Sequence, residues 1–168
     1  GKAGSRKKKT AAAKPAAVKE ADRIFAERLG RHHDELRWLY MELYGNDAMF
    51  AELCEQMKRY YDQRNAKLKK LDREREAAGA WYRKRDMLGM MLYIDNFAGN
   101  IRGVQEKLPY LEKCHVNYVH LMPFLDTPKG RSDGGYAVAD FRKVRPDLGT
   151  MEDLAALAEQ CHDRGISL

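Results

Sequence analysis

The feature that most constrains the fold is a change of hydrophobic period after Trp81. Residues 88–94 are a continuous apolar run, the pattern of a strand that is covered on both faces, and residues 116–122 are interpreted as a second buried strand. A segment with helical spacing, 101–113, lies between them. A second helical segment begins with a capping-box pattern at Thr150–Asp153 and leads to a third strand that starts at Ile166. This order of strands and helices predicts a parallel sheet with crossover connections.

The part of the chain before the change of period has helical spacing. From Pro15 to Ala78 we expect four helices: the first closed by Gly30, the second ended by Gly45, the third capped by Asn46 or Asp47, and a short charged fourth. Aromatic and methionine side chains at this spacing are interpreted as core rather than as a cofactor site.

The positive charge is concentrated at the amino terminus. The formal net charge is +6, but residues 1–19 hold seven of the 31 lysines and arginines and no acid, which leaves 24 bases against 25 acids in the remainder. We expect residues 1–17 to be a disordered basic tail. Such a tail is either a solvated leader or linker, or a contact for an acidic partner such as nucleic acid.

The remaining bulk features exclude several classes of protein. The three cysteines, Cys54, Cys114 and Cys161, are far apart and form no CxxC pair, so neither a disulfide framework nor a zinc site is expected, and no metal or cofactor is predicted. No apolar run reaches the ~18 residues that a membrane span needs, and the sequence shows no signal-peptide pattern. These features predict free thiols in a cytoplasmic protein without a membrane partner.

The segment between the second strand and the last helix, 123–149, is the candidate functional loop. It is far longer than an ordinary connection, and long loops at the carboxyl ends of parallel strands commonly carry function. Gly134 and Gly135 permit a tight turn. Tyr136 offers a flat apolar ring with a hydroxyl, and Asp133 offers two acceptors for sugar hydroxyls or a partner for an arginine. A polyol-binding loop and a purely structural loop both remain open from composition alone.

A resemblance to a known family supports the first alternative. The stretch YVHLMPFLDTPKGRSDGGYAVADF, followed by LGTMEDL, closely resembles the amylosucrase group of glycoside hydrolase family thirteen, within the α-amylase superfamily. The upstream stretches MLYIDNFAGNIRGV and LRWLYMELYG are similar to the same group, whose members carry a helical domain before the barrel. The resemblance covers about residues 18–168 and is most specific from residue 88 onward.

The resemblance implies a helical amino-terminal domain at 18–80 and the start of a (β/α)8 TIM barrel at 81–168, with about three strands and an end inside strand three. Members of the group cleave sucrose by a retaining mechanism and transfer glucosyl to an α-1,4-glucan or to water. In them, the tyrosine matching Tyr136 stacks on the glucosyl ring, and the aspartate matching Asp133 closes the bottom of the pocket. Most relatives carry a glycine near His115, where a helix is expected to end in a left-handed conformation.

The catalytic residues of the family lie on later strands, so none is expected in this chain, and Asp95, Asp126 and Glu152 are not assigned to replace them. The 168-residue chain alone is therefore predicted to be inactive. Sucrose hydrolase and maltose–trehalose isomerase activities remain alternatives, as does a non-catalytic interaction module with a nucleic-acid-binding tail. An unclosed barrel is expected to be poorly protected beside a folded helical part, and it can self-associate.

Overall fold

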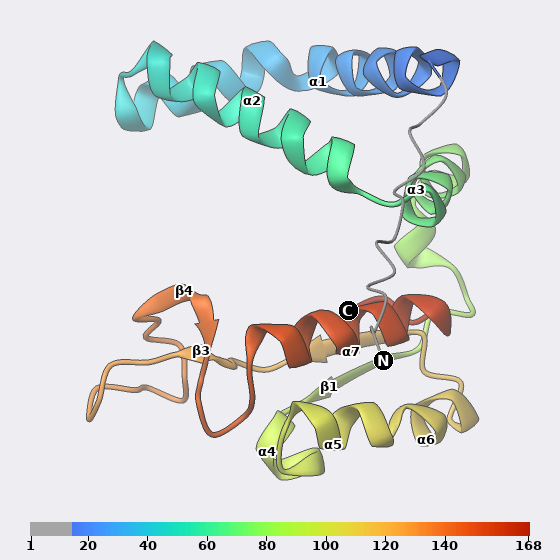
Figure 1. Cartoon of the computed structure of the whole chain (residues 1–168), viewed down its shortest axis with the longest axis vertical. Coiled ribbons are helices and arrows are strands. Elements are labelled where there is room, and N and C mark those ends of the chain that lie inside the picture. The colour runs from blue at the N-terminus through green and yellow to red at the C-terminus, as the bar shows by residue number, and fades with distance from the viewer. Residues whose placement is uncertain (1–14) are drawn as a thin grey trace, which may run out of the picture. The chain divides into compact units, whose positions relative to one another are not determined.

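A computed structural model describes the backbone of residues 15–168 and the side chains from Glu20 onward (Figure 1). The chain divides into two compact units, the first ending at Gly79 and the second spanning Ala80–Leu168. Almost all of the predicted basic tail, residues 1–17, lies outside the described residues. Only its last three residues are described, and they begin helix α1.

The first unit contains three helices: α1 (Pro15–Tyr44), α2 (Asp47–Gln63) and α3 (Ala66–Ala78). The prediction that Gly30 closes a helix is wrong, because α1 continues through it. A glycine inside a helix costs only about 1 kcal/mol. Here Glu76 of α3 accepts hydrogen bonds from Arg28 (2.8 and 2.6 Å) and from Arg31 (3.1 Å), on either side of Gly30. These contacts fix both flanks of the glycine to the same neighbouring helix.

The two predicted boundary residues between α1 and α2, Gly45 at the end of α1 and Asn46 at the start of α2, are confirmed. Gly45 has φ +59° and donates its amide to the carbonyl of Met41 at 2.9 Å. The Asn46 side chain accepts a hydrogen bond from the Met49 amide at 3.1 Å and so caps α2. Among the described residues of this unit, Phe50 is the one buried hydrophobic residue. The centre of its ring lies 5.6 Å from the centre of the Tyr40 ring.

The second unit begins with a 3-10 turn at Trp81–Arg83 and contains a parallel strand pair. Its elements, in chain order, are β1 (Gly89–Leu92), α4 (Ile94–Ala98), α5 (Ile101–Glu106), α6 (Leu108–Lys113), β2 (Tyr118–Leu121), β3 (Leu125–Asp126), β4 (Asp140–Val144) and α7 (Met151–Asp163). Strands β1 and β2 pair in parallel register from Gly89 opposite Tyr118 to Leu92 opposite Leu121. Tyr118 also forms an isolated parallel bridge with Ser167. The predicted parallel order is thus confirmed, the third strand being present as a single bridge and the barrel not closed in the described residues.

The helices of the second unit cover one face of the strand pair. Met90 and Leu92 of β1 and Val119 of β2 turn toward the core, while Met91 is 69% exposed. The prediction that both faces are covered is therefore wrong for these residues. Helices α5 and α7 pack side by side, and the Gln105 side chain donates to the backbone carbonyl of Asp153 at 2.9 Å.

The predicted helix 101–113 is divided into α5 and α6. Pro109 has no amide hydrogen to donate to the carbonyl of Gln105, so the helical ladder is interrupted near Lys107. The inward positions of the two helices are still those expected from the sequence. Val104, Leu108 and Leu111 are completely buried.

Most of the buried hydrophobic residues lie in the second unit, and the expectation that this unclosed part is poorly protected stays a prediction. Thirteen buried residues form one cluster: Leu92, Ile94, Ile101, Val104, Leu108, Leu111, Val116, Val119, Val144, Leu148, Leu157, Cys161 and Ile166. The three cysteines are free thiols, and burial raises the pKa of Cys161 to about 11. The strands and helices of this unit therefore share one buried hydrophobic core even though the sheet is small.

Two helices of the second unit end in the same type of turn. After α6, the amides of His115 and Val116 donate to the carbonyls of Glu112 (2.8 Å) and Leu111 (3.0 Å). After α7, Gly165 and Ile166 repeat this pair of bonds to His162 (3.2 Å) and Cys161 (2.9 Å). Both are Schellman motifs, which require a left-handed residue after the cap.

His115 has φ +58° and is the one non-glycine residue with positive φ in the described part of the chain, whereas Gly165 has φ +73°. This confirms the left-handed position expected at His115. Replacing His115 by glycine should raise the free energy of unfolding by about 1 kcal/mol, because the left-handed strain is relieved. Urea denaturation of the 168-residue chain measures it.

The matched variant is Gly165→His, which places a histidine in the equivalent turn. No atom lies within 4 Å of a Cβ built at Gly165, so its cost, also about 1 kcal/mol, should come from the backbone alone. A His115→Gly chain no more stable than the parent would contradict this account of the turn.

Candidate functional site

The loop 123–149 has regular structure of its own at its base. Strands β3 and β4 pair antiparallel, with Leu125 opposite Val144 and Asp126 opposite Asp140, and a bulge between the two pairs. The Ala139 amide donates to the carbonyl of Asp126 at 2.8 Å. The sequence predicted a long irregular connection, because a two-residue strand gives no periodic signal. This small sheet joins the ends of the loop tip, 127–139.

The predicted site residues Asp133 and Tyr136 lie at the two ends of one tight turn. The Tyr136 amide donates to the Asp133 carbonyl at 3.0 Å, and Gly134 and Gly135 between them have φ +58° and +88°. Positive φ at both central positions is the requirement of a type I′ turn and explains the two adjacent glycines. The Ser132 hydroxyl also accepts a hydrogen bond from the Gly135 amide at 3.0 Å.

The turn is folded back onto the end of β2. Gly135 is buried, and a Cβ built on it would lie 2.8 Å from the Cβ of Pro123, which follows β2 closely in the chain. A Cβ on Gly134 would instead meet the Tyr136 ring at 3.6 Å, an ordinary contact. The second glycine is therefore required both by its φ and by the close approach of Pro123.

Both proposed binding side chains are open to solvent. Tyr136 is 66% exposed, and Asp133 is exposed as well. Across residues 20–168, neither the Asp133 carboxylate nor the Tyr136 hydroxyl has a hydrogen bond or an ion pair. An exposed aromatic face and an unpaired carboxylate, held at opposite ends of one turn, can stack on a sugar ring and accept hydrogen bonds from its hydroxyls.

An arginine at the end of β4 connects the loop to the end of β1. Arg145 donates from Nη2 to Asp95 Oδ2 (3.1 Å) and from Nε to Asp147 Oδ1 (2.8 Å). Burial acts to raise the pKa of Asp95, but hydrogen bonds from the Asn96 amide and from Arg145 lower it overall. Asp95 is therefore an ionised partner of an arginine and is unsuited to act as a general acid at neutral pH.

Other polar residues of the loop have local partners. Asp140 accepts from the Arg142 amide at 2.8 Å and from Lys143 Nζ at 3.2 Å, and the first of these contacts contributes most to lowering its pKa.

Sequence reasoning missed two residues at this end of the loop. Arg145 pairs with Asp95, which lies 50 positions earlier in the chain, and Phe141 of β4 is 76% exposed. The Phe141 ring is the kind of exposed apolar group that a scan for unpaired aromatics in the loop would find.

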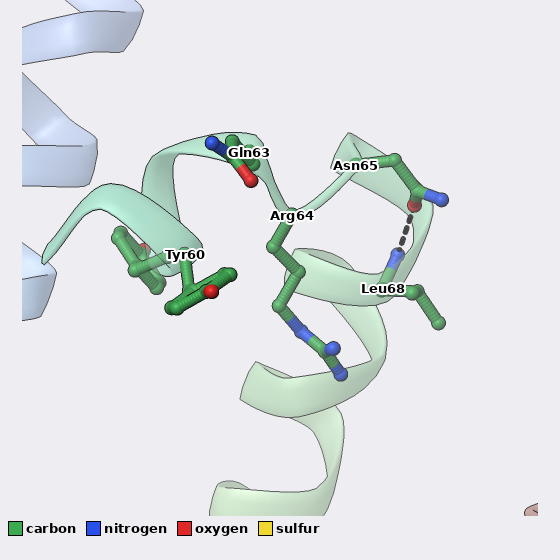
Figure 2. Close-up of a pocket in the computed structure, with 6 residues that line it drawn as sticks. Tyr60, Gln63, Arg64, Asn65 and Leu68 are labelled. Atoms are coloured by element: carbon green, nitrogen blue, oxygen red, sulfur yellow. Dashed lines mark hydrogen bonds between the residues drawn. The ribbon is translucent and has the colours of Figure 1, made fainter. Parts of the chain in front are cut away.

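Among the described residues, hollows are also found outside the loop, and three of them are considered in turn. One, of about 540 Å³, lies where α2 meets α3 and is lined by Tyr60, Tyr61, Gln63, Arg64, Asn65 and Leu68 (Figure 2). Two of its polar groups already have structural roles: Asn65 accepts from the Leu68 amide at 2.8 Å, as the dashed line shows, and Arg64 pairs with Asp72 at 2.6 and 2.8 Å. A second hollow of about 980 Å³ lies among the three helices.

The third hollow, of about 560 Å³, lies at the amino ends of β1 and β2. There the Asn117 side chain donates to the carbonyl of Asp86 (2.6 Å) and accepts from the Leu88 amide (2.9 Å).

Among the residues that the structure describes, no group of three or more His, Cys, Asp or Glu side chains could hold a metal ion. No described helix is long and apolar enough to span a bilayer.

Comparison with known proteins places this geometry in context. Residues 58–168 match the family model described as Alpha amylase, catalytic domain. The trehalose synthase/amylase TreS of Mycobacterium tuberculosis (strain ATCC 25618 / H37Rv) is 41% identical over 71 residues, which cover 42% of this chain. The trehalose synthase of Pimelobacter sp. (strain R48) is 43% identical over 68 residues, or 40% of the chain. Each match covers 12% of the relative's own length, so the chain corresponds to a small part of these proteins.

Among solved structures, the trehalose-6-phosphate hydrolase of Bacillus licheniformis is 28% identical, with a TM-score of 0.46 over 52% of this chain and 16% of that one. The isomaltulose synthase of Protaminobacter rubrum is also 28% identical, with a TM-score of 0.45 over the same shares of the two chains.

The close approach of Gly135 to Pro123 gives a test of the turn. Gly135→Ala should lower the free energy of unfolding by about 2–3 kcal/mol, because it combines left-handed strain with a steric clash. Gly134→Ala should cost only about 1 kcal/mol, because its Cβ has room. Urea denaturation of both variants measures the difference, and equal effects would show that the Pro123 contact does not constrain the turn.

Proposed function

Because the chain belongs to the alpha-amylase family of catalytic domains, we propose that it is the amino-terminal part of an amylosucrase-like enzyme. Such an enzyme cleaves sucrose by a retaining mechanism and transfers the glucosyl group to an α-1,4-glucan or to water. One observation carries the proposal: the turn after β2 presents the exposed ring of Tyr136 and the unpaired carboxylate of Asp133 from a loop at the carboxyl end of a parallel strand.

The turn contributes binding rather than bond cleavage. The Tyr136 ring stacks on the apolar face of the glucosyl unit, and the Asp133 oxygens accept hydrogen bonds from its hydroxyls. The two glycines between them form a tight turn without side chains, so that a pyranose ring can approach the backbone. The glucosyl group is thereby oriented for chemistry that residues of later strands perform.

A retaining mechanism requires a nucleophilic carboxylate and an acid/base carboxyl group roughly 5 to 5.5 Å apart. The resemblance to the amylosucrase group assigns these groups to strands after residue 168. In the proposal, the 168-residue chain therefore binds sugar without turning it over, and sucrose and an α-glucan acceptor are partners of the longer enzyme. A cytoplasmic location is part of the same proposal.

A second candidate activity is the isomerisation of maltose to trehalose. It is favoured by the names of the two relatives described above, both of which are called trehalose synthases. A sucrose hydrolase would use the same glucosyl-binding turn and differ only in the acceptor. The nucleic-acid-binding alternative depends on the basic residues 1–14, which lie outside the described part of the chain.

The binding role of Tyr136 can be tested on the 168-residue chain. Tyr136→Ala should weaken glucose or sucrose binding, followed by nuclear magnetic resonance titration, by roughly tenfold, the factor that corresponds to about 1.4 kcal/mol of lost stacking. Tyr136→Phe should bind nearly as tightly as the parent, because the ring is retained. The matched control is Tyr82→Ala, which removes another exposed tyrosine of the same unit. Equal affinities for Tyr136→Ala and Tyr82→Ala would refute the assignment.

The two candidate activities are distinguished by substrate in the full-length enzyme. Amylosucrase activity predicts fructose release from sucrose together with elongation of an added α-1,4-glucan, both seen by chromatography. Trehalose formation from maltose, without turnover of sucrose, would establish the second candidate instead. Sucrose turnover by a clean preparation of the 168-residue chain would contradict the assignment of the catalytic groups to later strands.

A further inference from the structure

We infer that Arg145 is a positioning residue, which fixes the loop that carries Asp133 and Tyr136 against the carboxyl end of strand β1. The mechanical part of this inference stands on contacts within the second unit. Its consequence for sugar binding rests on the proposed function.

The Arg145 guanidinium joins two carboxylates from different parts of the chain. Nη2 lies 3.1 Å from Asp95 Oδ2, and Nε lies 2.8 Å from Asp147 Oδ1. Asp95 belongs to α4, three positions after β1 ends, while Asp147 follows β4 and precedes α7. The Arg145 side chain is only 27% exposed, so the guanidinium is half-enclosed between its partners.

The backbone around Arg145 adds a third connection. Its amide donates to the carbonyl of Phe124 at 2.9 Å, just after β2, and its carbonyl accepts from the Leu148 amide at 2.9 Å. Leu148 is buried, and its own carbonyl accepts from the Ile101 amide at the start of α5. The segments that follow β1, β2 and β4 therefore meet at one residue.

The chemistry favours arginine over lysine at this position. A guanidinium is planar and donates from separate edges, so it can bind two carboxylates at once in a fixed geometry. A lysine is a point charge that would satisfy one of them well. Because each ion pair is partly exposed, its contribution to global stability is small. The principal effect of Arg145 is on the local position of the loop.

That local position matters because β4 leads directly into Arg145. The pairing of β3 with β4 joins the ends of the tip 127–139, and the Ala139–Asp126 hydrogen bond lies on the tip side of this pairing. Without Arg145, the small sheet is attached to the rest of the unit by fewer contacts. The turn with Tyr136 would then sample positions that differ from the one seen here.

Amide hydrogen exchange of the 168-residue chain tests the mechanical part. In Arg145→Ala, exchange at Ala139 and Tyr136 should accelerate by about five- to tenfold, the factor expected from losing two partly exposed ion pairs. Core amides of α7, such as that of Leu157, should exchange at the parent rate. Arg142→Ala is the matched control, because it removes a nearby guanidinium that has no ion pair among the described residues, and should change neither region.

Three further measurements separate positioning from general stabilisation. Asp95→Asn should reproduce most of the acceleration of exchange in the loop. Combined with Arg145→Ala, it should give less than the product of the two single effects, because both variants remove the same Arg145–Asp95 ion pair. Arg145→Lys should be intermediate. In sugar titrations, Arg145→Ala should weaken binding by about threefold to tenfold while the urea midpoint changes little.

Each outcome is decisive. Unchanged loop exchange in Arg145→Ala, or equal acceleration in the loop and in α7, would overturn the inference. If the parent chain binds no sugar but the loop exchange responds as described, the proposed function fails while the positioning role of Arg145 stands.

Discussion

The packing of helices α5 and α7 against one face of the β1–β2 pair is the constraint on which the second unit depends. Val104 of α5 and Leu157 of α7 are completely buried in this contact. The side-by-side contact of the two helices places both of them on the same face of the strand pair. Because the strands are parallel, the segments that follow β1 and β2 emerge at the same edge. The meeting of Asp95, Phe124 and Arg145 is a consequence of that arrangement.

Local signals in the sequence predicted much of this architecture. The capping box at Thr150 is present, with the Thr150 hydroxyl accepting from the Asp153 amide at 3.2 Å and the Asp153 carboxylate accepting from the Thr150 amide at 3.0 Å. The left-handed residue at His115 was also predicted correctly, from the resemblance to relatives that carry a glycine near this position. Parallel strand order follows from the alternation of apolar runs and helical segments, which is likewise readable from the chain.

Features that depend on distant partners could not be predicted in the same way. Gly30 reads as a helix end until Glu76, 46 positions later, is seen to bind both of its flanks. Nothing in the local sequence distinguishes Arg145 from other surface arginines, because its partner Asp95 lies 50 positions earlier in the chain. For the candidate site, the glycine pair predicted a tight turn, but the contact with Pro123 and the small β3–β4 sheet appeared only in three dimensions.

The uninterrupted course of α1 has a mechanical consequence. A helix of 30 residues is about 45 Å long. Glu76 contacts arginines on both sides of the glycine, where bending would be easiest, and so opposes a kink at Gly30. The continuity of α1 at this glycine is therefore supported by a tertiary contact as well as by the helix's own backbone hydrogen bonds.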